Sequence, residues 1–133
     1  MNKPLNLDYV ASQCAQKIVD NADKDAKTLD ILATKTLEVL QEQGVYAMVL
    51  FLLSRSKKEE IKISKIIRSS LYRVLEKVPD LDKNIPETDQ NPNETLKFYS
   101  EITENLERLL LVRALYEKTL IYTRFGAKAA KKG

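Results

Sequence analysis

Residues 45–53 read Val-Tyr-Ala-Met-Val-Leu-Phe-Leu-Leu, which is the longest apolar run in the chain. The run is too short to cross a membrane, since a spanning helix needs about 20 residues. It follows Gly44, and glycine readily takes the left-handed backbone conformation that ends a helix. We therefore expect a separate helix from Val45 to about Ser54. Because that helix has almost no polar face, we expect it to be the central element of the core.

Amphipathic helices are predicted on both sides of this run, because apolar residues recur there at spacings of three and four. The expected helices are about Asn6–Asp20 with Asn6 as N-cap, Thr28–Gln43, Lys58–Val78, and a long region from a cap at Asn93 to about Phe125. The expected interruptions are the polar stretch Asn21–Lys27, Pro79, a break near Ser100–Thr103 with Thr103 as a further cap, and Gly126. Residues 109–112 are all apolar, so we expect them to be buried nearly all round.

The composition supports a helical protein. Gly (3) and Pro (4) are scarce, while Leu, Ile, Lys and Glu are plentiful, and this mix favours helix over sheet. A chain of 133 residues is most simply one domain. We predict an all-α fold, a compact single-domain bundle of about five to six helices over residues 1–133. It should carry a variable acidic, proline-containing loop at 79–93 and a basic C-terminal tail at 127–133.

Charge is strongly segregated along the chain, although the net charge is only +3. Residues 1–53 sum to −2, residues 54–78 to +5, residues 79–107 to −6 and residues 108–133 to +6. Two basic stretches around an acidic one indicate a surface for an anionic partner, with nucleic acid as the leading candidate.

The residues that most enzymes need are missing from the sequence. There is no histidine, so histidine-based acid–base catalysis and the common zinc sites are excluded. The single cysteine, Cys14, lies on an apolar helix face, and no glycine-rich phosphate loop is present. We predict no enzyme activity, no cofactor and no metal. The alternative, an enzyme that uses carboxylates alone, has its best site at Asp20, Asp23 and Asp25, which lack the glycine and closing glutamate of a calcium loop.

Two basic helix faces are the candidate RNA-binding sites. The first consists of Lys62, Lys65, Arg68, Arg73 and Lys77, and the second of Arg113, Arg124 and Lys128. Such faces would hold phosphates without reading base sequence. Tyr72, Tyr116 and Tyr122 are candidates for stacking on bases, or else amphipathic residues at the edge of the core. The alternative for the basic faces is that they are solvated outer faces of a bundle, or that they meet acidic faces of protein neighbours.

Two segments resemble a known family. Gln43-Gly44-Val45-Tyr46-Ala47-Met48-Val49-Leu50-Phe51-Leu52-Leu53-Ser54-Arg55 resembles the Asn-Gly-Leu, apolar Phe-Leu helix and basic residue of the small subunit of Cmr-type (type III-B) CRISPR effector complexes. Tyr122-Thr123-Arg124-Phe125-Gly126-Ala127 is similar to that family's closing aromatic-x-Arg-Phe-Ala helix. The chain departs from the pattern at Gln43, Met48 and Ile121, where Asn, a small polar residue and a nearby Trp are usual.

The resemblance implies a non-catalytic subunit of an antiviral, RNA-guided ribonucleoprotein. In that family the small subunits stack beside the backbone subunits and line the path of the target RNA. The expected partners are guide or target RNA, other effector subunits and further copies of the chain, with no membrane. With one cysteine and no apolar segment of signal length at the N-terminus, we expect a cytoplasmic protein. The alternatives are a purely structural adaptor and a small subunit of another CRISPR effector type.

Overall fold

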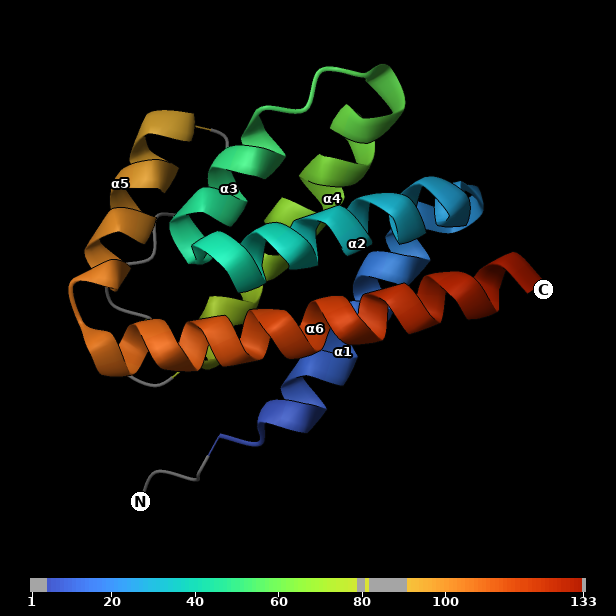
Figure 1. The fold of residues 1–133 in the computed structure, drawn as a ribbon. Helices are drawn as coiled ribbons and strands as arrows, with labels where there is room; N and C mark the ends of the chain where they lie inside the picture. Colours follow the sequence, from blue (N-terminus) through green and yellow to red (C-terminus); the bar gives the residue numbers. More distant parts are fainter. Residues whose placement is uncertain (1–4, 79–80, 82–90, 133) are drawn as a thin grey trace.

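The computed structural model describes residues 5–78, 81 and 91–132, and helices are the regular structure of these residues. They are α1 (Leu7–Ala22), α2 (Ala26–Gln43), α3 (Val45–Leu53), α4 (Lys58–Val74), α5 (Pro92–Thr103) and α6 (Leu106–Lys132), with 3-10 turns at Asp23–Asp25 and Leu75–Lys77. Figure 1 shows them packed as a bundle. The predicted all-α helical bundle is confirmed.

α6 is the longest helix and crosses the bundle against α1 and α2 (Figure 1). Its 27 residues give a length of about 40 Å at a rise of 1.5 Å per residue. Its inward side buries Val112, Leu115, Tyr116, Thr119, Leu120, Thr123 and Ala127. The prediction that α3 is the centre of the core was wrong. α3 contacts α2, α4, α5 and α6 and buries Val45, Met48, Val49 and Leu52, but its remaining face leaves Tyr46 and Leu50 exposed to solvent.

Gly126 does not end a helix, contrary to expectation, because α6 continues through it to Lys132. A Cβ added at Gly126 would lie 2.9 Å from Cγ2 of Val19, so the missing side chain allows α1 to approach α6 closely. The basic tail is therefore helical as far as Lys132, and Ala127 is fully buried. Gly44, by contrast, does end α2. Its φ is +95°, and its amide donates to the carbonyl oxygen of Leu40 at 3.0 Å.

Several helix boundaries are set by asparagine side chains. Asn6 caps α1 as predicted, accepting from the amide of Tyr9 at 3.0 Å. Asn91 caps α5 in place of the expected Asn93, since its side chain reaches the amides of Asn93 and Glu94. The predicted break after α5 is confirmed, but Asn105, not Thr103, accepts from an amide at the start of α6, that of Arg108.

The remaining predictions about helix interruptions and burial were not confirmed or could not be compared with the described residues. The polar stretch Asn21–Lys27 stays almost wholly helical, because α1, the 3-10 turn and α2 follow one another directly. Pro79 and most of the loop at 79–93 lie outside the described residues. Residues 109–112 are not buried all round. Val112 is buried, Leu109 and Leu111 are half-buried and Leu110 is exposed, because only part of the α6 surface faces the bundle there.

The core contains a chain of aromatic rings. Tyr72, Phe98, Tyr99 and Tyr116 are buried and meet edge to face, with centroids 5.6 to 6.4 Å apart. The hydroxyls of Tyr99 and Tyr116 lie 2.8 Å apart, and that of Tyr116 donates to the carbonyl oxygen of Leu71 at 2.7 Å. Of the two interpretations offered for Tyr72 and Tyr116, stacking on bases is therefore excluded in this fold, since both rings lie within the core. Burial raises the pKa of Tyr116 well above its ordinary value.

Candidate nucleic-acid interface

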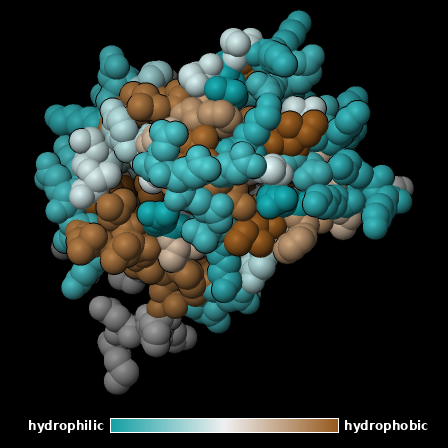
Figure 2. All heavy atoms as spheres, viewed as in Figure 1, coloured by the Kyte–Doolittle hydropathy of each residue, from teal (hydrophilic) through white to brown (hydrophobic). Residues whose placement is uncertain are grey.

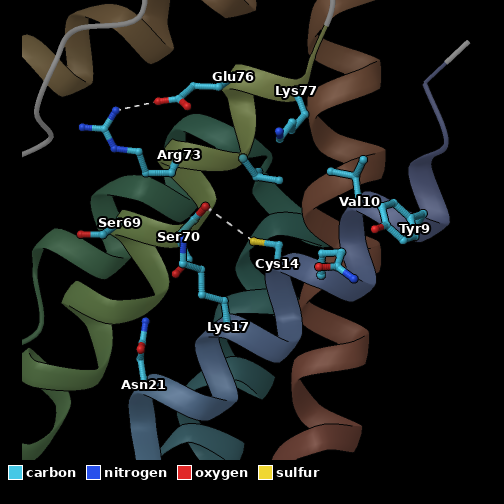
Figure 3. A pocket seen from close by; sticks show the side chains of 12 residues that line it. Tyr9, Val10, Cys14, Lys17, Asn21, Ser69, Ser70, Arg73, Glu76 and Lys77 are labelled. Carbon is cyan, nitrogen blue, oxygen red and sulfur yellow. Dashed lines mark hydrogen bonds and ion pairs between the residues drawn. The ribbon is translucent and has the colours of Figure 1, made fainter. Parts of the chain in front are cut away.

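The basic face of α4 forms one wall of a groove, and α1 forms the other. We call this the α1–α4 groove. Its larger part has a volume of about 700 Å³ and is shown in Figure 3. It is lined by Tyr9, Val10, Gln13, Cys14, Lys17, Asn21, Ser69, Ser70, Arg73, Val74, Glu76 and Lys77. A second hollow, lined by Asn21, Lys62, Lys65, Ile66, Ser69 and Ser70, shares three of these residues and continues the groove along α4.

Four of the five predicted α4 residues line this groove. Lys62 and Lys65 lie in its second part, and Arg73 and Lys77 lie in its larger part. The fifth, Arg68, is half-buried and lies outside the lining. The groove thus gathers most of the first predicted face into one concave surface.

Two of these cations are held by carboxylates of the chain itself. The Lys62 ammonium lies 2.8 Å from Oδ2 of Asp25, and the bond raises the pKa of Lys62 above its ordinary value. The Arg73 guanidinium lies 2.7 Å from Oε1 of Glu76, as the dashed line in Figure 3 marks. Both pairs are exposed, so such pairs contribute little stability and an external phosphate can compete for the cation.

Three other lysines keep the groove positive. Lys17 on α1, Lys65 on α4 and Lys77 after α4 are exposed, and among the described residues none of them forms a hydrogen bond or ion pair. In Figure 3 Lys17 extends from α1 toward Ser70. With one formal carboxylate, Glu76, in its lining, the groove carries an excess of positive charge.

The floor of the groove is unreactive. Cys14 is buried there, and its thiol donates to the carbonyl oxygen of Ser70 at 3.5 Å (Figure 3). Burial raises the pKa of Cys14 to about 12, so the thiolate that nucleophilic chemistry needs is not formed near neutral pH.

The second predicted face, on α6, is not part of this groove. Arg113 donates to the carbonyl oxygen of Gln41 at 2.9 Å and so binds the C-terminal end of α2. Arg124 is half-buried, and its Nε is buried with no hydrogen-bond partner among the described atoms. Lys128 is exposed. The three residues share a helix, but Arg113 is bonded to α2, Arg124 is half-buried and Lys128 alone is exposed.

The three aspartates considered as a carboxylate site, Asp20, Asp23 and Asp25, are not grouped as metal ligands would be. Asp20 accepts from the side chain of Gln16 at 2.8 Å, and Asp25 faces Lys62. Within residues 5–78, 81 and 91–132, no three His, Cys, Asp or Glu side chains are grouped as metal ligands would be. The third candidate tyrosine, Tyr122, is half-buried and donates to the Asp8 carboxylate, which lowers the pKa of Asp8.

The α1 wall of the groove was not predicted from the sequence. Lys17 and Asn21 follow Gln13 at spacings of four, so they share one polar stripe of α1. That stripe was a usable signal, but only the packing of α1 against α4 reveals that it faces the basic residues. Tyr9, at the end of the groove, was also missed.

A different surface is apolar. Figure 2 shows hydrophobic residues gathered over α3 and the first half of α6. The exposed leucines of these two helices are Leu50 on α3 and Leu106 and Leu110 on α6, and the two helices are in contact. We call this the α3–α6 patch. In the described part of the chain, no helix combines the length and the hydropathy that crossing a bilayer would require.

Comparisons of this chain with protein-family models, with curated proteins and with solved structures found no match.

Proposed function

We propose that this chain is a non-catalytic RNA-binding subunit of a ribonucleoprotein complex, and that the α1–α4 groove holds the RNA by its phosphates. One observation carries the proposal: Lys17 from α1, Lys65 from α4 and Lys77 from the 3-10 turn after α4 line a single groove, and no carboxylate of the described residues pairs with them. Cations placed in a concave surface concentrate the positive potential and attract a polyanion. Contacts of this kind release counterions and do not depend on base sequence.

The complex that fits best is an RNA-guided CRISPR effector of the Cmr type. Support for this finer proposal is the resemblance of residues 43–55 and 122–127 to the small subunit of such effectors. In this structure, residues of both segments take part in helix packing and in hydrogen bonds within the chain. Arg55 donates to the carbonyl oxygen of Phe51 at 3.0 Å and lies 3.8 Å over its ring, and Gly126 allows the close approach of Val19. The resembling residues therefore act in packing in this chain, so they support the proposed bundle more than they support RNA contact.

The α3–α6 patch supports a place inside a larger assembly. Exposed leucines that gather on one surface are typical of protein–protein contacts. One copy of the chain offers only a few phosphate contacts, so we expect weak RNA binding in isolation and stronger binding through avidity when subunits and RNA assemble.

The test is a charge reversal confined to the groove. The triple variant Lys17→Glu, Lys65→Glu, Lys77→Glu leaves the Lys62–Asp25 and Arg73–Glu76 pairs in place. The matched control, Lys27→Glu, Lys35→Glu, Lys97→Glu, changes three exposed lysines outside the groove and gives the same net charge. Binding of labelled single-stranded RNA is measured by fluorescence anisotropy at low salt.

We expect the groove variant to lose affinity on the order of 10- to 100-fold, and the control to lose much less. The salt slope should also fall by about 2, since each phosphate contact on a single strand contributes about 0.7. Equal losses in both variants would mean that only net charge matters, and the groove proposal would be wrong. Wild-type protein that binds partner subunits but no RNA would favour the structural adaptor.

A further inference from the structure

Tyr9 stands apart from the other tyrosines of the α1–α4 groove region. It lies in the first turn of α1 and lines the groove at the end seen at the right of Figure 3. Its side chain is 60% exposed, whereas Tyr72 and Tyr116 are buried. The Tyr9 ring therefore contributes little to the core, whereas the neighbouring Val10 is partly buried and packs against the core.

Tyr9 takes part in no ring–ring or cation–π contact with the other described residues. In the described part of the chain, the edge-to-face ring pairs are those of the buried core tyrosines and Phe98. The arginine–ring contacts are those of Arg55 with Phe51 and of Arg73 with Tyr72. An aromatic side chain held at the end of a cationic groove offers a flat apolar face beside positive charge. Proteins that bind single-stranded nucleic acids combine these two features, since bases stack on the ring and the cations follow the backbone.

We propose that Tyr9 is a stacking platform for an unpaired base, and that the ligand of the groove is single-stranded RNA. The inference rests on the proposed function and adds the form of the RNA. Lys17 lies two helical turns beyond Tyr9, which is about 12 Å along α1 at 1.5 Å per residue. The two residues therefore lie one after the other along the α1 wall of the groove, where Tyr9 would contact a base and Lys17 a phosphate further along the strand. A duplex keeps its bases in its own stack and cannot use Tyr9.

The test compares Tyr9→Ala, Tyr9→Phe and Tyr46→Ala, the last removing an exposed tyrosine on α3 outside the groove. Three probes are used: a uridine strand of about ten nucleotides, a strand of the same length without bases, and an RNA duplex. Circular dichroism checks that each variant keeps the helical content of wild type.

We expect Tyr9→Ala to weaken binding of the uridine strand by about 5- to 100-fold. Tyr9→Phe keeps the ring and should bind within about twofold of wild type, as should Tyr46→Ala. Binding of the base-free strand and of the duplex should be the same for Tyr9→Ala and wild type.

Two results would overturn the inference. Tyr9→Ala could weaken the base-free strand as much as the uridine strand, which would place the effect on the backbone or the fold. It could also bind the uridine strand like wild type while the Lys17, Lys65, Lys77 triple variant loses affinity. In that second case the groove would still hold RNA, so the stacking inference fails alone. If wild type binds none of the three probes, the proposed function fails as well.

Discussion

The close packing of α1 against α6 at Gly126 predicts how the substitution Gly126→Ala changes the free energy of unfolding. Two effects of Gly126→Ala oppose one another. Alanine in a helix interior is favoured over glycine by about 1 kcal/mol. The new Cβ would lie 2.9 Å from Cγ2 of Val19, and a β-branched side chain has little freedom to turn away. Overpacking of this kind costs about 1–3 kcal/mol. The steric term wins, and we expect a net loss of about 0–2 kcal/mol in the free energy of unfolding.

Removing the obstacle should reverse the sign. In a Val19→Ala background the Cγ2 atom is absent, so Gly126→Ala should stabilise the protein by about 0.5–1 kcal/mol. The free energies of unfolding come from urea titrations followed by circular dichroism, and the four proteins form a double-mutant cycle. We expect a coupling of about 1–3 kcal/mol. If Gly126→Ala stabilises both backgrounds equally, Val19 does not limit the approach of the helices and the explanation of this glycine is wrong.

Three further predictions concern single side chains. Because burial raises the pKa of Cys14 to about 12, a disulfide reagent at pH 8 should label the native protein far more slowly than the protein in urea; equal rates would contradict the buried thiol. Tyr116→Phe removes the donor to the Leu71 carbonyl and should cost about 1–3 kcal/mol in a urea titration, whereas an unchanged midpoint would mean that water replaces it. Tyr122 lowers the pKa of Asp8 below 3.8, so this contact stabilises the fold above that pH and is lost as pH falls through the lower folded-state value. The melting temperatures of wild type and Asp8→Asn should therefore differ at pH 7, and the difference should shrink as the pH falls below 3.8; a constant difference would refute the linkage.

The helices could be predicted from sequence because their signals are local. Apolar spacing located α1, α2 and α4, the continuous apolar run after Gly44 located α3, and Gly44 and Asn6 act at their own helix ends. Gly126 could not be interpreted in this way. The sequence does not distinguish the roles of the two glycines. Gly44 has a positive φ, whereas Gly126 leaves room for Val19, a residue far away in the chain. Burial was also hard to predict, since an apolar run such as 109–112 does not reveal which side of α6 faces the bundle.

The candidate site was predictable in part for the same reason. One helix face can be derived from spacing, and the α4 residues Lys62, Lys65 and Arg73 do lie along one groove. Its second wall depends on which helix packs beside α4, and this is a tertiary property. The tyrosines show the limit most clearly. Tyr72 and Tyr9 are equally aromatic in the sequence, but the fold buries the first and exposes the second.

The most direct test of the central claim is to map where RNA touches the protein. A single-stranded RNA containing 4-thiouridine is crosslinked to the wild-type chain, and the modified peptides are identified by mass spectrometry. The account predicts crosslinks on α1 and on residues 58–77, with Tyr9 and the groove lysines at or beside the modified positions. Crosslinks confined to the C-terminal end of α6 around Lys128, with none on α1 or α4, would contradict it.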